Sequence, residues 1–239
     1  MLRGCCLVLV SLWLAGCAAR QQDIAADSPP RLHGTGVVLG SVTSLADQTR
    51  SPPWQESSSY FFRSTDNPEV TGVVRSGGSN NLSGWDEQPC AADGLEQACG
   101  RLFALELPAG TYQITAVQVN NLGSRHAIYP AAAYSRLLEN VYFTVQAGEL
   151  RYLGNLESRV CVGAAGSYGN LEVWAVRGEV RDEHARDWPL LTNKFPWLQG
   201  LAITPAVIQT QPWLWMRPKP APADQWPAEC GPYPDGTGP

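Results

Sequence analysis

The residues that could carry out chemistry in this chain are scattered carboxylates, three histidines and seven cysteines. A hydrolase needs a nucleophile beside a base, together with an acid that orients the base. The motif Gly-x-Ser-x-Gly is absent, and the histidines lie far apart in the sequence. His33 falls in a predicted tether, His126 in a predicted loop and His184 at a charged helix start. We therefore interpret all three histidines as surface residues.

Pairs of acidic residues are the remaining source of hydrolytic chemistry, because two carboxylates can act as acid and base on a glycosidic bond. The candidate pairs are Asp86 with Glu87, Glu179 with Asp182, and Asp182 with Glu183. Adjacent acids in turns are usually solvated, so we predict that the chain is not an enzyme and has no catalytic residues. An envelope hydrolase stays open as an alternative, with the carboxylates near the helix start: Asp182, Glu183 and Asp187.

The N-terminal segment has the pattern of a lipoprotein signal. Arg3 supplies a positive charge, and the apolar run over residues 5–14 is shorter than the roughly 20 residues that span a bilayer. The run ends in Leu-Ala-Gly-Cys at residues 14–17, which resembles the bacterial lipobox at all four positions. The resemblance implies cleavage before Cys17 and acylation of its thiol and of the new amino group. The alternative is an ordinary signal peptide with an incidental cysteine.

The expected location follows from the lipid. Several acyl chains give durable membrane anchoring. By the rule of the lipoprotein family, Ala18 after the lipidated cysteine implies transport to the outer membrane, whereas an aspartate there is associated with retention in the inner membrane. We therefore expect the protein to be anchored in the outer membrane and to face the periplasm. The net charge of -5 and the absence of a basic stripe exclude nucleic acid as the expected partner.

The other cysteines favour disulfides. Four remain after residue 17, and an even number in an oxidising compartment is typical of paired cysteines. Of the three possible pairings we favour Cys90 with Cys99, which closes a short loop, and by elimination Cys161 with Cys230. In the chain-entropy model these bonds contribute roughly 3 and 4 kcal/mol. A zinc site is disfavoured because Cys-x-x-Cys and histidines at ligand spacing are absent. We predict no metal and no cofactor.

The strongest structural signal lies between residues 102 and 157, where two hydrophobic stretches are each divided by a turn of the form x-Ala-Gly-x. In the first turn, Pro108 presets the backbone and Gly110 suits the fourth position. The flanking runs alternate with period two, which predicts two β-hairpins that supply the central strands. The alternation slips after Ala116, which predicts a β-bulge or a strand that changes sheets.

Further strand patterns lie at 36–44, 58–63, 70–75 and 171–180. With the four strands of the two hairpins, they bring the expected number of strands to about eight. The predicted fold class is therefore mainly β, an antiparallel β-sandwich of the immunoglobulin or prealbumin type. The predicted organisation is a signal peptide (1–16), a lipidated flexible tether (17–34), a β-sandwich domain (35–181), a short helix (182–198) and a C-terminal tail (199–239).

The chain changes character after residue 181. In the predicted helix, Asp187 can cap the N-terminus, Pro189 fits the first turn, and Leu191 and Phe195 can face the sandwich. The tail is rich in proline, and we expect it to be extended with little regular structure. Its tryptophans either cover the sandwich or form an aromatic strip for a partner or a glycan. The candidate contact residues, including two in earlier loops, are Trp54, Trp85, Trp213, Trp215 and Trp226.

Two segments carry a resemblance to a known group. Residues 107–112 have the form Leu-Pro-Ala-Gly-x-Tyr, and residues 143–154 have the form Phe-x-Val-x-x-Gly-Glu-x-x-Tyr-Leu-Gly. They resemble a group of bacterial lipoproteins and exported proteins with no assigned activity. The first pattern is also similar to carboxypeptidase-regulatory and transthyretin-like sandwich domains. The resemblance covers roughly residues 35–198; it implies a β-sandwich lipoprotein and carries over no catalytic residue.

The predicted function is a non-enzymatic, membrane-anchored β-sandwich that binds another envelope component or serves structurally. The expected partners are the membrane, through the lipid on Cys17, and an envelope protein or peptidoglycan. The alternative is a module that binds peptidoglycan or another glycan through its tryptophans.

Overall fold

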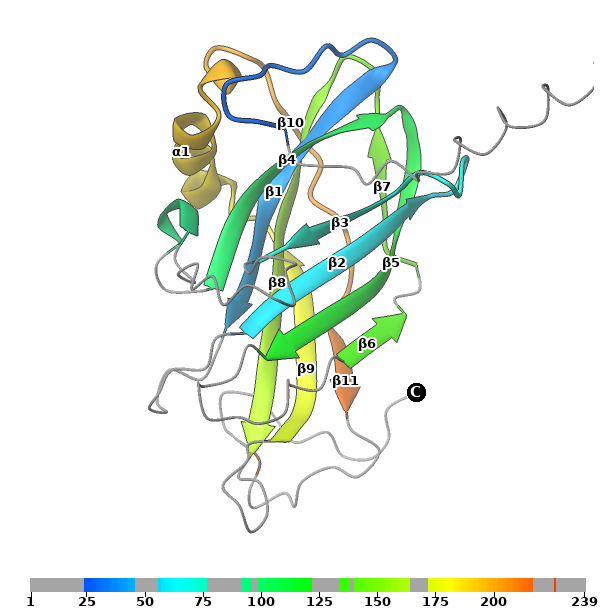
Figure 1. The fold of residues 1–239 in the computed structure, drawn as a ribbon, viewed down its shortest axis with the longest axis vertical. Coiled ribbons are helices and arrows are strands. Elements are labelled where there is room, and N and C mark those ends of the chain that lie inside the picture. Colours follow the sequence, from blue (N-terminus) through cyan, green and yellow to red (C-terminus); the bar gives the residue numbers. More distant parts are fainter. Residues whose placement is uncertain are drawn as a thin grey trace, which may run out of the picture.

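The computed structural model describes residues 24–45, 56–76, 92–95, 99–121, 134–137, 140–163, 172–216 and 226. Over these residues the chain is mainly β, with two sheets, here named A and B, and one α-helix (Figure 1). This confirms the mainly β prediction. No helix in the described ranges is long and apolar enough to cross a membrane.

Sheet A has the strand order β11-β9-β8-β1-β4. Its long strands are β1 (Thr35–Leu45), β4 (Cys99–Pro108), β8 (Leu150–Gly163) and β9 (Glu172–Arg181). Strand β1 runs parallel to β8, whereas the β1–β4 and β8–β9 pairs are antiparallel. Two short strands, β10 (Thr204–Pro205) and β11 (Trp213–Met216), pair with β8 and β9. The region after residue 198 therefore adds strands to sheet A, where little regular structure was predicted.

Sheet B has the order β3-β2-β5-β6, and β7 also pairs with β5. All of these pairs are antiparallel. The strands are β2 (Glu56–Ser64), β3 (Thr71–Arg75), β5 (Gly110–Asn121), β6 (Tyr134–Leu137) and β7 (Tyr142–Val145). In β5 the register skips Thr115, because Phe61 lies opposite Ala116 and Phe62 lies opposite Ile114. This bulge confirms the predicted slip in the alternation.

The two sheets share an apolar core. Sheet A contributes β1 and β4 side chains such as Val38 and Leu105, and sheet B contributes an aromatic group. In that group the rings of Tyr112 and Phe143 are stacked with centroids 5.2 Å apart, and Phe62 meets Phe143 edge-on at 5.8 Å. Each of these large side chains is buried, which contributes about 1.5–3 kcal/mol per side chain.

The two x-Ala-Gly-x turns are corners between the sheets, and the prediction of two β-hairpins is wrong. Strand β4 pairs with β1 in sheet A, while β5 begins in sheet B; the second turn likewise leads from β7 in sheet B to β8 in sheet A. The side chains before and after the first corner, Leu107 and Tyr112, point into the same core from opposite sheets. The Tyr112 hydroxyl closes this corner by donating to the Pro108 carbonyl at 2.8 Å. Gly148 adopts a φ of 79°, which favours glycine in the second corner.

Helix α1 (His184–Lys194) and the 3-10 turn η2 (Pro196–Leu198) lie on the outer face of sheet A, the face turned away from sheet B (Figure 1). Leu191 and Phe195 are buried against this face, as predicted. The helix begins at His184, inside the predicted range of 182–198, and its N-cap is Glu183. Asp187 therefore does not cap the helix; it lies inside it, and its side chain is buried.

The N-terminal segment is docked on the domain. The Ile24 backbone N–H donates to the Ala104 carbonyl at 2.8 Å, and Ile24 and Leu32 pack against the same apolar cluster as α1 and η2. The tether was predicted to extend to residue 34. Instead, residues from 24 onward follow the outer face of sheet A, because Ile24 and Leu32 bury apolar surface there.

The exposed edge of β4 is covered by three contacts. Besides the bond from Ile24, the Leu102 N–H donates to Asp93 Oδ2 at 3.0 Å, and Lys194 Nζ donates to the Leu102 carbonyl at 2.9 Å. Asp93 comes from the 3-10 turn η1 (Ala92–Gly94) and also pairs with Lys194. An edge strand covered in this way does not pair readily with another chain.

Candidate functional site

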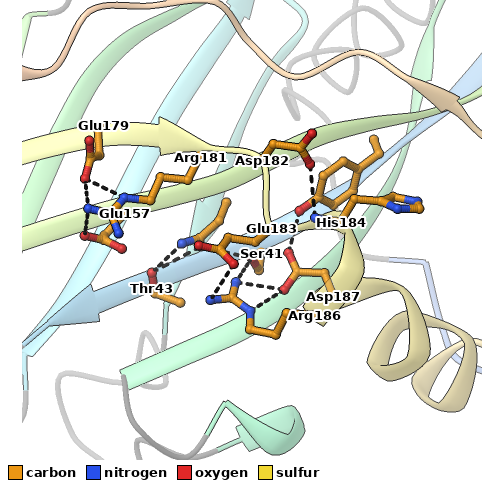
Figure 2. Close-up of polar contacts among 12 residues, drawn as sticks. Ser41, Thr43, Glu157, Glu179, Arg181, Asp182, Glu183, His184, Arg186 and Asp187 are labelled. Carbon is orange, nitrogen blue, oxygen red and sulfur yellow. Dashed lines mark hydrogen bonds and ion pairs between the residues drawn. The ribbon is translucent and has the colours of Figure 1, made fainter.

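Polar residues gather on the outer face of sheet A next to the start of α1. The strand register places them there in rows, since residues two apart on β1, β8 and β9 point to the same face. One group, here named the polar cluster, consists of Ser41, Thr43, Tyr152, Asn155, Arg186 and Asp187. The other, named the charged cleft, consists of Glu157, Arg159, Arg177, Glu179 and Arg181. Figure 2 shows most of both groups side by side.

The Asp187 carboxylate is the centre of the polar cluster and is fully buried, with 0% exposure. Its Oδ2 accepts hydrogen bonds from the hydroxyls of Ser41 at 2.6 Å and Tyr152 at 2.7 Å. Its Oδ1 lies 2.8 Å from both Nε and Nη2 of Arg186. Burial raises the pKa of Tyr152 above its usual range and the Asp187 charge raises it further, so the phenol remains a donor. Three side chains thus satisfy this buried charge.

Ser41 is the hydroxyl nearest to this carboxylate, but its surroundings do not activate it. Its single proton is shared between Asp187 Oδ2 and Asn155 Oδ1, which lies 2.9 Å away. Its Oγ also accepts a hydrogen bond from Arg186 Nη2 at 3.0 Å. Ser41 is fully buried, so a substrate has no access to it.

The only histidine ring near the polar cluster in the described ranges belongs to His184, and it does not complete a catalytic triad. It stacks on Trp188 with centroids 5.8 Å apart and meets the edge of Tyr152 at 5.1 Å. Figure 2 shows the imidazole turned away from Ser41 and Asp187. A serine hydrolase needs the base between the hydroxyl and the acid. Here serine and aspartate contact each other directly, which suits a structural role.

The charged cleft is built by the pairing of β8 with β9. Glu157 lies opposite Glu179, and Arg159 lies opposite Arg177. Arg181 occupies the row before the glutamates, opposite Asn155. The glutamate row and the Arg159–Arg177 row each bring two like charges together, and the arginines on either side of the glutamates supply the opposite charge.

Arg181 joins the two glutamates. Its Nε donates to Glu179 Oε1 at 2.6 Å, and its Nη2 lies 3.5 Å from Glu157 Oε1 (Figure 2). Glu157 is the more buried of the two acids, with 9% of its side chain exposed against 30% for Glu179. Burial raises the pKa of Glu157; Arg181 opposes this shift and the charge of Glu179 adds to it.

The cleft has a volume of about 290 Å³, large enough for a small ligand or part of a chain. Besides the five charged residues, it is lined by Gly178 and Pro212. Three arginines against two glutamates leave one excess positive charge when all five are ionised. This local excess contrasts with the net charge of -5 of the whole chain.

Of the carboxylates predicted as a possible hydrolytic set, Glu183 and Asp187 both contact Arg186, and Asp182 makes a separate contact. Asp182 is exposed and accepts a hydrogen bond from the His184 backbone at 3.1 Å. Glu183 lies 3.9 Å from Arg186, while Asp187 is buried in the polar cluster. Within the described ranges, no group of three or more potential ligands is placed to hold a metal ion.

Two of the predicted tryptophan contacts can be placed. Trp213 lies over Gly178, where a Cβ atom would collide with the indole, and its ring meets Tyr60 edge-on at 6.5 Å. It therefore packs at the margin of the core between the sheets. Trp226 is half-buried beside Cys161 and Ala175. Trp54, Trp85 and the side chain of Trp215 lie outside the described residues.

Among the predicted disulfide cysteines, Cys161 is buried and disulfide-bonded. The strand order excludes Cys99 as its partner. Cys99 lies on β4 opposite Ser44 of β1, and β1 separates β4 from β8. Two strand spacings are about 10 Å, which exceeds the Cα separation of roughly 7 Å that a disulfide can bridge. Cys17, Cys90, Cys230 and the side chain of Cys99 lie outside the described residues, so the two pairings stay predictions.

Sequence reasoning missed the charged cleft, although a signal for it exists. Glu157 and Arg159 are two residues apart, and so are Arg177, Glu179 and Arg181. Charges at that spacing along a strand lie on one face, and Arg159 and Arg181 each lie just beyond the end of a predicted strand. Their pairing across strands required the register, which the sequence pattern did not supply.

No protein-family model matches the chain, and no curated protein or solved structure is significantly similar to it. The interpretation of the site therefore depends on its geometry.

Proposed function

We propose that this chain is a lipid-anchored protein of the bacterial outer membrane that binds an anionic envelope component in the charged cleft and catalyses no reaction. The observation that carries the proposal is the contrast on one sheet face between a sealed polar cluster and an open cleft with excess positive charge. Arginine recognises carboxylates and phosphates through paired hydrogen bonds, so an arginine-lined cleft suits an anionic partner.

The anchoring part of the proposal is supported by the sequence. The Leu-Ala-Gly-Cys motif at residues 14–17 follows a short apolar run and a basic residue, and Ala18 follows the cysteine. Acylation of Cys17 would hold the domain at the membrane on the periplasmic side.

The fold part of the proposal is an antiparallel β-sandwich of the immunoglobulin or prealbumin type. It is supported by the shared core of sheets A and B and by the corners at which the chain passes from one sheet to the other. The parallel pairing of β1 with β8 is a departure from a purely antiparallel arrangement. A sandwich of this kind offers a rigid face on which a binding site can be displayed.

The absence of catalysis is supported by how the reactive groups are used in the described ranges. The Ser41 hydroxyl and the Asp187 carboxylate are buried and bonded to each other, and the Glu157 and Glu179 carboxylates share Arg181. Hydrolysis that is abolished by Glu157→Gln or Glu179→Gln, in assays across glycosidase and esterase substrates, would contradict this part of the proposal.

A second candidate function, peptidoglycan binding, is favoured by the same cleft. The stem peptides of peptidoglycan carry free carboxylates, which suit the arginines of β8 and β9. This differs from binding through tryptophans, because Trp213 packs inward against Tyr60.

The test compares the lipidated wild-type chain with a double variant, Arg159→Ala/Arg177→Ala, and with a matched control, Arg63→Ala, an exposed arginine of sheet B. Each protein is crosslinked in its native envelope and isolated, and the bound material is identified by mass spectrometry. A stoichiometric protein that is lost with the double variant but kept with Arg63→Ala supports an accessory subunit.

The same three proteins are then sedimented with purified peptidoglycan. Binding that falls at least tenfold in the double variant supports the second candidate. Binding partners and peptidoglycan affinities that are the same in all three proteins would refute a role for the charged cleft.

A further inference from the structure

The docked N-terminal segment limits how far the domain can move from its lipid. Six residues, 18–23, separate Cys17 from Ile24, which is held by its bond to Ala104. Seven residue steps reach at most about 24 Å when fully extended. A free tether through residue 34 would reach about 60 Å.

This reach is short in relation to the domain. A folded unit of roughly 200 residues is about 40 Å across. A chain anchored at Ile24 therefore cannot turn its far side to the bilayer. The layer that carries Ile24 on the outer face of sheet A therefore belongs to the side of the domain that lies nearer to the membrane.

In the described ranges, the surface of that layer contains partly buried apolar residues and one exposed leucine. Ile24 and Leu32 share one apolar cluster with Trp197, Leu198 and Ile203, so the N-terminal segment and the chain around η2 lie together. Figure 1 shows the two segments at the same end of the domain. Leu201, in the loop after η2, is 45% exposed. In the described ranges only Tyr142 is a large hydrophobic residue with comparable exposure.

We infer that the surface formed by residues 24–33 and 196–203 contacts the lipid bilayer, with Leu201 entering its interfacial region. This inference rests on the proposed acylation of Cys17. Leucine and tryptophan are residues that interfacial segments place at the boundary of headgroups and acyl chains. Tyr142 belongs to β7 of sheet B, on the other side of sheet A, and so faces away from the bilayer.

The orientation has a consequence for the charged cleft. The cleft lies on the same face of sheet A, beyond the start of α1, and is lined by β8 and β9. A bilayer against η2 and the N-terminal segment therefore leaves the cleft on the membrane-facing side of the domain.

The test places a photo-crosslinking phenylalanine analogue at position 201 or, as the matched control, at position 142. Each full-length acylated protein is reconstituted into vesicles of phosphatidylethanolamine and phosphatidylglycerol that contain a biotinylated lipid. We expect at least fivefold more lipid adduct at position 201 than at position 142. Both variants should have the melting temperature of the wild type, which establishes that they are folded.

A third protein carries eighteen glycine and serine residues inserted after residue 20, with the analogue at position 201. The longer linker should reduce the lipid adduct by at least half. Equal adducts at positions 201 and 142 in an acylated chain, or an unchanged adduct with the long linker, would overturn this inference alone. Mass spectrometry that finds no acyl groups on Cys17 would overturn the proposed anchoring as well.

Discussion

The polar cluster and the charged cleft are neighbours on one sheet face and use the same groups, arginine and carboxylate, in different ways. In the polar cluster, α1 covers the sheet, and Asp187 is fully buried with three donor side chains. Over the charged cleft no helix of the described part of the chain covers the strands, and 45% of the Arg181 side chain is exposed.

This difference indicates what each region contributes. Removing one partner of a buried ion pair strands a charge in a medium that cannot solvate it. Exposed ion pairs contribute little to stability because water and salt screen them. The polar cluster therefore holds α1 on sheet A, whereas the groups of the cleft can exchange their bonds for those of a ligand at small cost.

The largest effect is expected from Asp187→Ala. The change leaves Arg186 without its buried partner and leaves the hydroxyls of Ser41 and Tyr152 without an acceptor. We expect a loss of about 3–5 kcal/mol in the free energy of unfolding, measured by urea denaturation. Hydrogen exchange should show that the amides of α1 lose protection.

The matched control for this variant is Asp182→Ala. Asp182 lies five residues earlier, is exposed and accepts only the His184 backbone N–H, so its loss should cost about 1 kcal/mol. Equal losses for the two variants would contradict the structural role assigned to the polar cluster.

A smaller loss of stability, confined to the strands of the charged cleft, is expected from Cys161→Ser. Cys161 lies opposite Ala175, in the row after Arg159 and Arg177, and it is disulfide-bonded. Loss of the bond should cost about 2–4 kcal/mol. Exchange should increase at the ends of β8 and β9 that border the cleft, with α1 unchanged.

Peptide mapping without reduction tests the predicted pairing of the cysteines. We expect Cys161 to be linked to Cys230, and this link should persist in a Cys90→Ser/Cys99→Ser control. A link from Cys161 to Cys90 would contradict the prediction.

The sequence was sufficient for those elements whose signal is local. The positions of β1, β2 and β3 follow from short runs of strand-forming residues, and the helix follows from its polar start and from the apolar residues Leu191 and Phe195. The bulge near Thr115 was also visible as a change of parity.

The sequence failed where the answer depends on which strands pair. A proline–alanine–glycine turn between two hydrophobic runs is compatible with a hairpin and with a corner between sheets, and local pattern does not distinguish them. The local pattern was also insufficient for the site. Asp187 lies near the start of a helix, where capping is common, so the sequence predicted a cap. Its partners Ser41 and Tyr152 come from strands more than 30 residues away. Long-range register decided both cases.

The smallest expected effect is a change in pH dependence on Glu157→Gln. Burial raises the pKa of Glu157 above the value of 4.5 that applies to the unfolded chain. Below pH 4.5 the carboxyl is protonated in both states. As the pH rises, the unfolded chain ionises first, so this group lowers the stability until the pH has passed its raised folded pKa. Replacing Glu157 with glutamine, whose amide is neutral at every pH, removes this loss of stability.

The measurement is urea denaturation of the wild type and of Glu157→Gln between pH 4 and pH 7. The free energy of unfolding of the variant, relative to wild type, should increase as the pH rises, so the variant should become relatively more stable. Glu179→Gln is the matched control, because it removes the other carboxylate bound to Arg181 from a more exposed side chain. Its pH-dependent gain should be smaller. A relative stability of Glu157→Gln that is constant or falls over this range would mean that solvent reaches the carboxylate. Glu157 would then not be more buried than the other residues of the charged cleft, and the distinction drawn between them would fail.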